Sequence, residues 1–232
     1  MAINTNVLYS KADAVDFYVN NNFTFPSAGY LVILECGRYQ HTVVTVGGVA
    51  MTNYPNLIGN QSDLYVAKVN AGTYTVYLDK ALYDIQIVLF ENAANLLQVI
   101  RTTSYTNYWT GSITPQKGHS IAHFAYGKNQ SWRTNTTGFT GTSGVLVENA
   151  DTAAGGSGGD WWHVTAVASK SNAGTSTINT TGYSISSGTM TRLTWALEFE
   201  EAGGSNSVIW WFKKWLKEKK KEMFPTSELV YI

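Results

Sequence analysis

Four histidines are the side chains in this sequence best suited to acid–base chemistry or metal binding. His119 and His123 are four residues apart, and on an extended strand that spacing separates them by about 13 Å, which is too far for one metal ion. His41 and His163 stand elsewhere in the chain, and Cys36 is the single cysteine, so no cysteine pair completes a metal-binding set. We therefore expect no metal ion and no cofactor.

Motifs for covalent catalysis and phosphate binding are equally absent from the sequence. It contains neither the G-x-S-x-G element of serine hydrolases nor a P-loop. Asp160 precedes Trp161 and Trp162, but glycoside hydrolysis needs two carboxyl groups, and no second one is indicated. The sequence thus predicts no catalytic residue and a protein that is not an enzyme.

Aromatic residues in or beside predicted loops form one candidate binding site. Aromatic rings can stack on sugar rings, so these residues could form a glycan-binding edge. They could equally pack the ends of a sandwich or a contact between subunits. The candidates are Tyr105, Tyr108, Trp109, Trp132 and Trp161.

A second candidate site lies near the carboxyl end, where the hydrophobic period changes from that of a strand to that of a helix. Ser205 or Asn206 can cap this helix, and Pro225 ends it. Lysines fill the opposite face and cluster in the last turns, where they interact favourably with the helix dipole. The predicted docking residues on its apolar face are Val208, Ile209, Trp211, Phe212, Trp215 and Leu216.

This amphipathic helix has three interpretations. It docks on another protein subunit or a copy of this chain, it packs on its own sandwich, or it lies on an anionic membrane surface. It cannot span a bilayer, because its apolar run stops at Leu216. The aromatic content favours a protein partner, since a solvated helix does not expose so many large apolar side chains. The lysines are confined to one short segment, so we expect no nucleic-acid partner.

The elements that position these residues read as β-strands. The run from Tyr30 to Leu34 is apolar and bracketed by glycines, which predicts a strand buried on both faces. Gly47-Gly48 between β-branched runs predicts a hairpin. A second hairpin is expected between 64–69 and 73–79, with Tyr74, Val76 and Leu78 on one face. Turn signals about every ten residues are typical of an all-β sandwich or barrel.

Part of this region resembles a known class of proteins. The string Thr45-Val-Gly-Gly-Val-Ala-Met-Thr52, after a Leu-Val-Ile-Leu strand, is similar to a hairpin of β-sandwich proteins from tailed-phage virions and bacterial surface proteins. The segment from Asp63 to Tyr77 fits the same pattern of strand, turn and strand. The resemblance covers about residues 20 to 200 and is sharp over about fifty of them. It implies a virion or surface role and carries no catalytic residues.

Charge is sparse and unevenly distributed. Charged residues make up 14% of the chain, and its formal net charge is zero. Residues 1–204 hold ten Lys and Arg against thirteen Asp and Glu, whereas the remainder holds six against three. A mildly acidic body therefore carries a basic C-terminal element. The first nineteen residues lack the apolar core of a signal peptide, which predicts synthesis in a cytoplasm.

These observations together predict an all-β fold, a jelly-roll-like β-sandwich with a C-terminal amphipathic α-helix. We expect the sandwich over residues 1–202 and the helical anchor with an extended tail over 203–232. The predicted function is a non-enzymatic structural component of a phage virion, a capsid-decorating or tail protein held in the particle by its helix. Its partners would be other virion proteins or copies of itself, with a membrane surface as the weaker alternative. The competing hypothesis is a carbohydrate-binding module or adhesin that recognises host surface glycans.

Overall fold

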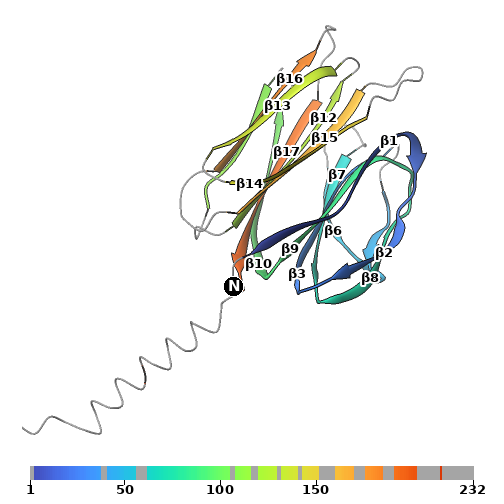
Figure 1. The fold of residues 1–232 in the computed structure, drawn as a ribbon, viewed down its shortest axis with the longest axis vertical. Coiled ribbons are helices and arrows are strands. Elements are labelled where there is room, and N and C mark those ends of the chain that lie inside the picture. The colour runs from blue at the N-terminus through green and yellow to red at the C-terminus, as the bar shows by residue number, and fades with distance from the viewer. Residues whose placement is uncertain are drawn as a thin grey trace, which may run out of the picture.

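The chain is almost entirely β-structure in the residues that the computed structural model describes. These are 3–37, 41–55, 62–104, 108–115, 120–129, 132–140, 143–151, 160–169, 176–184 and 191–202, together with Trp215. The prediction of an all-β fold is confirmed (Figure 1). The strands are β1 (Asn4–Phe17), β2 (Asn20–Phe25), β3 (Gly29–Gly37), β4 (Val44–Val46), β5 (Val49–Ala50), β6 (Thr52–Tyr54), β7 (Ser62–Val69), β8 (Gly72–Leu78), β9 (Leu82–Glu91), β10 (Ala93–Ser104), β11 (Tyr108–Ile113), β12 (Ser120–Asn129), β13 (Trp132–Thr140), β14 (Ser143–Asp151), β15 (Asp160–Ser169), β16 (Ser176–Ser184) and β17 (Thr191–Glu201).

The strands form four antiparallel sheets. Sheet A has the order β1-β9-β3-β7-β6, and sheet B has the order β2-β8-β4-β5. Sheet C has the order β10-β17-β12-β15-β14, and sheet D has the order β11-β16-β13. The first half of the chain thus makes sheets A and B, and the second half makes sheets C and D.

The two halves repeat one strand order. The inner sheets correspond strand for strand, because the order β1-β9-β3-β7-β6 matches the order β10-β17-β12-β15-β14. In each half the first strand pairs with the last strand, and the last strand also pairs with the third. In the outer sheets, β2-β8-β4 corresponds to β11-β16-β13. The chain therefore contains the same topology twice, with Asn92 in the short turn between the two copies.

Sheet A is covered on both faces, which confirms the prediction for the strand from Tyr30 to Leu34. Leu31 and Ile33 of β3 belong to an apolar core shared with sheet B. Val32 and Leu34 point the other way, into a core shared with sheet C. All four are 0% exposed. Successive residues of a strand face opposite sides, so an uninterrupted apolar run is what a doubly covered strand requires.

The core between sheets A and C joins the two halves. Phe90 of β9 stacks on Phe199 of β17, with ring centroids 4.5 Å apart and an interplanar angle of 25°. Phe124 approaches Phe90 edge-on at 6.2 Å, and Trp195 is 0% exposed in the same core. A smaller core containing Ile113, Ile121 and Ala196 lies between sheets C and D. The architecture is β-sandwich-like, with four stacked sheets in the order B, A, C, D (Figure 1).

The hairpin at Gly47-Gly48 is confirmed. Val46 pairs with Val49, and the two glycines have φ of 57° and 79°, the left-handed region that a twisted two-residue hairpin turn requires. A Cβ at Gly47 would also lie 2.8 Å from the ring of Tyr74. Both backbone conformation and close packing therefore favour glycine at position 47.

The second predicted hairpin is wrong in its pairing, although both of its strands exist. β7 pairs with β3 and β6 in sheet A, whereas β8 pairs with β2 and β4 in sheet B. Residues 70–71 therefore carry the chain from one sheet to the other. The inward side chains explain this arrangement, because Val76 and Leu78 of β8 face sheet A across the core and cannot do so from within sheet A. Tyr74, Val76 and Leu78 do share one face, as predicted.

We predict that Phe199→Ala lowers the free energy of unfolding by about 3–5 kcal/mol, because it removes a fully buried ring and leaves a cavity between the halves. Chemical denaturation followed by far-UV circular dichroism and tryptophan fluorescence measures this loss. Phe23→Ala, at a half-buried position, is the matched control and should cost less. Because both halves share the core, the unfolding transitions of the wild type measured by circular dichroism and by fluorescence should coincide. Unfolding transitions at different denaturant concentrations would contradict a shared core.

Candidate functional site

A cluster of polar side chains is buried at one end of the first half. Glu35 lies near the end of β3, His41 follows that strand, and Asp79 follows β8. Glu35 is 1% exposed and His41 is 5% exposed. The His41 ring lies between the two carboxyl groups, with Nδ1 3.1 Å from Asp79 Oδ1 and Nε2 3.5 Å from Glu35 Oε2.

Asp63 and its neighbours extend the cluster across β7. The backbone N–H of Asp63 donates to Glu35 Oε1 at 3.2 Å. The Tyr65 hydroxyl and the Asn53 amide both donate to Asp63 Oδ2 at 3.2 Å. Burial raises the pKa of the Tyr65 hydroxyl, so this phenol remains a hydrogen-bond donor at every ordinary pH.

Asp79 is the ionised member of the cluster. Burial acts to raise its pKa, but hydrogen bonds from Thr42, Val43 and His41 outweigh that effect and lower the pKa to about 2. The backbone N–H of Thr42 donates to Asp79 Oδ1 at 3.2 Å, and the Thr42 hydroxyl donates to Oδ2. Asp79 therefore fixes the segment from His41 to Val43 against the turn between β8 and β9.

The pKa values of Glu35 and His41 are shifted in the directions that disfavour an ion pair between them. Burial and the charge of Asp63 raise the pKa of Glu35 well above its usual value. Burial lowers the pKa of His41, against the hydrogen bond and charge of Asp79, which raise it. These directions favour a protonated Glu35 beside a neutral His41. His41 Nδ1 has both Asp79 Oδ1, at 3.1 Å, and the backbone N–H of Lys80, at 3.2 Å, within hydrogen-bond distance. A neutral pair avoids leaving an ion pair in a buried setting.

The chemistry available to this cluster is limited by access. The His41 side chain is 0% exposed and the Glu35 side chain is 2% exposed, so a substrate reaches neither group. The cluster links β3, β7 and the β8–β9 turn through hydrogen bonds, and we assign it a structural role at that end of the first half. Within the described residues no group of three or more His, Cys, Asp or Glu side chains is arranged to hold a metal ion.

This cluster was not predicted from the sequence. His41 was considered only as a metal ligand and was not connected with Glu35, Asp63 or Asp79. The available signal was Glu35, a single acidic residue directly after an apolar strand, because a carboxyl group at such a position needs a buried partner.

The register of the second half brings the described aromatic candidates to one end of sheets C and D. Tyr108 and Trp109 begin β11, and Trp132 begins β13; both strands flank the end of β16. Trp161 is near the start of β15, opposite the end of β12, and β12 is followed within three residues by β13. Tyr105 lies outside the described residues, between β10 and β11. Starts and ends of neighbouring antiparallel strands alternate, so all these positions share one edge.

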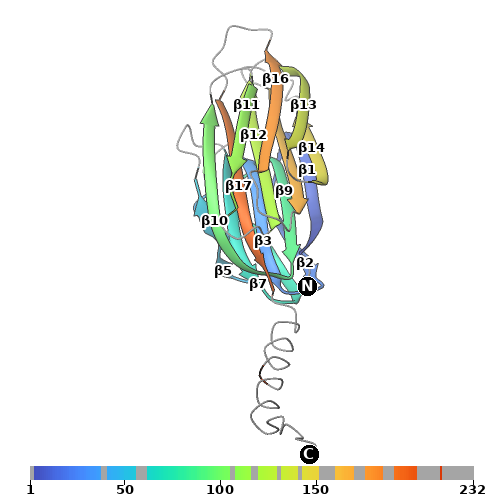
Figure 2. The ribbon, with the colours of Figure 1, turned by 90° about the vertical axis from the view of Figure 1, so that its left-hand side faces the viewer.

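The chain ends leave from the opposite edge. β17 starts at the aromatic edge and ends at Glu201, and the Ala202 N–H donates to the Asn92 carbonyl at 2.7 Å. Ile3 precedes β1, whose Asn4 pairs with Glu91. Figure 2 shows the N-terminus beside the end of β17. At about 3.3 Å per residue, β17 separates the two edges by about 35 Å.

Of the six predicted docking residues, Trp215 is the one that the structure describes. Its backbone is helical and the residue is 45% exposed. Val208, Ile209, Trp211, Phe212 and Leu216 lie outside the described residues, so the helix and its docking face remain predictions. No helix in the described part of the chain is both long and apolar enough to cross a membrane.

No protein-family model matches this chain, and no curated protein and no solved structure matches it either.

We predict that Asp79→Asn lowers the free energy of unfolding at pH 7 by about 1.5–3 kcal/mol, because it removes a charged acceptor from several hydrogen bonds. The pKa of Asp79 is lowered to about 2 from its usual 3.8. Its stabilising effect is therefore complete above pH 3.8 and is lost as the pH falls towards 2.

Urea denaturation of both proteins as a function of pH measures this difference. It should be constant from pH 7 to about 5 and should shrink in more acidic solution. Glu91→Gln is the matched control, because Glu91 accepts only longer bonds from Asn4 and Asn6, at 3.4 and 3.3 Å. An Asp79→Asn loss no larger than that of Glu91→Gln would contradict the assigned role of Asp79.

Proposed function

We propose that the chain is a non-enzymatic structural component of a phage virion, a capsid-decorating or tail protein that its C-terminal helix holds in the particle. The observation that carries the proposal is the polarity of the fold. The chain continues towards the predicted helix at Ala202, about 35 Å along the strands from the edge that holds Trp109 and Trp132. An anchor at one edge leaves the opposite edge facing outward.

The proposal also includes a more specific fold for each half of the chain. We infer that each half is a jelly roll, because each divides its strands between two sheets and joins its first strand to its last. Jelly rolls are double-sheet folds that occur in viral capsid and lectin domains. The order β1-β9-β3-β7 facing β2-β8-β4-β5 is the fuller of the two. The predicted boundary at residues 202 and 203 separates this body from the anchor.

The docking face consists of Val208, Ile209, Trp211, Phe212, Trp215 and Leu216, and its partner is another virion protein or a second copy of this chain. The exposure of Trp215 supports docking, since 45% of a large aromatic residue is open to a partner. Burying apolar surface contributes about 25 cal/mol per Å², so several such residues stabilise an assembly by several kcal/mol. The protein itself would be made in the host cytoplasm and function in the virion.

We expect deletion of residues 205–232 to give a folded protein that no longer enters the particle, because the sheets are complete at Glu201. Far-UV circular dichroism reports the fold, and the protein content of purified particles reports incorporation. Lys219→Ala with Lys220→Ala keeps the apolar face and serves as a control that should incorporate normally. Normal incorporation of the truncated protein would rule out the helix as the anchor. If the full-length protein is recovered with membranes and the truncated protein is not, the membrane alternative is favoured.

A second candidate function is glycan recognition by the aromatic edge, as in a carbohydrate-binding module or adhesin. The observation that favours it is the shared edge of Tyr108, Trp109, Trp132 and Trp161. β11 and β13 lie two strand spacings apart across β16, roughly 10 Å, a separation that an oligosaccharide can bridge.

We expect Trp109→Ala combined with Trp132→Ala to weaken glycan binding at this edge at least tenfold if it is a lectin site. Loss of one stacked base costs about 1–3 kcal/mol in nucleic-acid sites, a guide to aromatic stacking in general. A glycan array with both proteins measures the change. Unchanged binding to every glycan retained by the wild type would remove the aromatic edge as a lectin site.

A further inference from the structure

The outer face of sheet B is free of charge. Its four strands β2, β4, β5 and β8 contain no Asp, Glu, Lys or Arg, in a chain where 14% of residues are charged. A sheet face open to water ordinarily carries such residues, because they are the side chains most often exposed. Their replacement by neutral polar groups across a whole face therefore calls for a physical reason.

This surface, termed the neutral face, is defined by the alternation of its strands. Val46, Val76 and Leu78 point inward and belong to the core with sheet A. The residues between them point outward, and all are exposed except the half-buried Thr45. The neutral face comprises Asn20, Asn22, Thr24, Thr45, Thr73, Thr75 and Tyr77, with Tyr18 and Val43 at its end.

Hydrogen bonds within the neutral face hold its polar groups in place. The Thr75 hydroxyl donates to Asn22 Oδ1 at 2.7 Å. Thr24 and Thr73 are bonded through their hydroxyl oxygens at 3.0 Å. Each of these pairs is also a cross-strand pair in the register of β2 and β8. The amide of Asn22 is therefore oriented before any ligand arrives, which lowers the entropy cost of binding.

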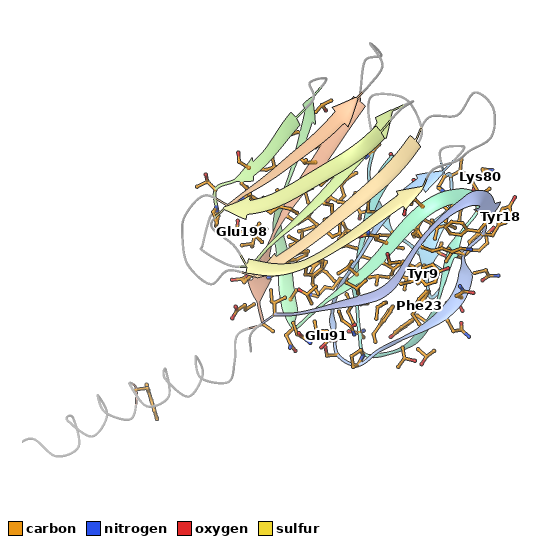
Figure 3. The ribbon with its side chains drawn as sticks, turned by 45° about the horizontal axis from the view of Figure 1, so that its top comes forward. Tyr9, Tyr18, Phe23, Lys80, Glu91 and Glu198 are labelled. Atoms are coloured by element: carbon orange, nitrogen blue, oxygen red, sulfur yellow. The ribbon has the colours of Figure 1, made fainter. Side chains whose placement is uncertain are left out.

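Exposed aromatic rings stand at one end of this polar array. Tyr18 is 69% exposed, Tyr77 is 39% exposed and Val43 is 44% exposed. The backbone brings them together, because Leu78 N–H donates to Val19 O at 3.0 Å and Asp79 N–H donates to Val43 O at 3.1 Å. Figure 3 shows Tyr18 at the end of the first half that also carries Lys80, away from Glu91.

A charged pair follows β8 at the border of the neutral face. Lys80 Nζ lies 3.6 Å from Asp79 Oδ2, so the border of the neutral face carries a matched pair. An anionic or cationic ligand would find no opposite charge on this surface. The surface instead offers amide and hydroxyl groups beside aromatic rings, the combination of polar groups and aromatic surface that small-molecule sites use for orientation and contact.

The size of the neutral face argues against another protein as its partner. Its strand residues lie on the three neighbouring strands β2, β8 and β4, of at most seven residues each, which gives roughly 330 Å² at strand spacings of about 4.8 Å and a rise of about 3.3 Å per residue. A stable protein interface needs about 800 Å² on each partner. A single carbohydrate chain, with hydroxyl groups for Asn and Thr and apolar ring faces for Tyr, fits the smaller area.

We propose that the neutral face of sheet B binds a neutral polysaccharide, with Tyr18 and Tyr77 stacking on sugar rings and Asn20, Asn22 and Thr75 bonding to sugar hydroxyls. This site is separate from the aromatic edge of the second half, and it does not depend on the proposed virion role.

Native affinity electrophoresis of the full chain tests the proposal, with gels containing dextran, galactomannan or a soluble β-glucan, and alginate as the anionic comparison. The chain should be retarded by at least one neutral polymer and not by alginate. Tyr18→Ala with Tyr77→Ala should raise the dissociation constant at least tenfold. Asn22→Asp should also weaken binding severalfold, since it adds a charge that must be desolvated while retaining the acceptor for Thr75.

Two control variants distinguish this face from other surfaces. The Val49→Ala variant removes an apolar side chain that is 69% exposed, as Tyr18 is. Val49 pairs with the inward-facing Val46 and so is not part of the neutral face, and this variant should bind as the wild type does. Trp109→Ala, at the aromatic edge, should also leave binding unchanged. Thermal unfolding of each variant confirms that it is folded, and Asn22→Asp provides the test if the double tyrosine variant does not fold.

Several results would overturn the proposal. One is the absence of retardation by every neutral polymer, and another is equal retardation of the wild type and the face variants. Loss of binding in Trp109→Ala alone would move the site to the aromatic edge. A change in molar mass by light scattering on mutation of Tyr18 and Tyr77 would instead identify the neutral face as a contact between copies.

Discussion

The burial of sheet A on both sides is the constraint on which the rest of this structure depends. Its central strands β9, β3 and β7 contribute side chains to the core with sheet B and to the core with sheet C. Neither half can lose its partner without exposing one of these apolar faces to water. The stacked rings of Phe90 and Phe199 lie within that shared core. The turn at Asn92 connects β9, which carries Phe90, to β10, the strand that pairs with β17 and its Phe199. The two copies of the topology are thus joined by their least polar surfaces.

Polar groups occupy the positions that this arrangement leaves available. Acidic residues such as Glu35, Asp63 and Asp84 sit on the inner sheets, where each is at most 3% exposed. The outer sheet B presents amides and hydroxyls instead. The strands of sheet D are similar, since Arg133 is their single charged residue. The two outer sheets, B and D, therefore carry few charged residues, whereas protein surfaces that face solvent are ordinarily rich in them.

The sequence predicted those features that depend on local pattern. The uninterrupted run from Tyr30 to Leu34 indicated a doubly covered strand, and Gly47-Gly48 indicated a hairpin, because both signals are set by neighbouring residues. The assignment of β7 and β8 to different sheets depends on distant partners and could not be read from the Ala71-Gly72 turn. The polar composition of β1 indicated an edge strand only near Ala14 to Val19, whereas the strand runs over fourteen residues from Asn4 to Phe17. An edge strand needs fewer apolar residues than a central one, so its extent is not marked by an apolar run. The repeat was missed because it is a repeat of strand order with no evident sequence period.

The candidate sites divide in the same way. The aromatic residues were recognisable by type, but their common edge follows from the strand register. The Glu35–His41–Asp79 cluster joins residues from three separate segments, so spacing along the chain gave no sign of it. The neutral face was visible in principle as four strands without charge, but recognising it required knowing that these strands belong to one sheet.

The position of β17 as the final strand also has a consequence for biosynthesis. The last partner that covers Val32, Val88 and Phe90 is supplied by residues up to Phe199. At about 5–20 residues per second, a ribosome needs roughly 5–20 s to extend the nascent chain from β9 to β17. During that interval the apolar side of the first half has no permanent cover and can adhere to other nascent chains. The steps most vulnerable to aggregation therefore fall after the first half is made and before the last strand is released.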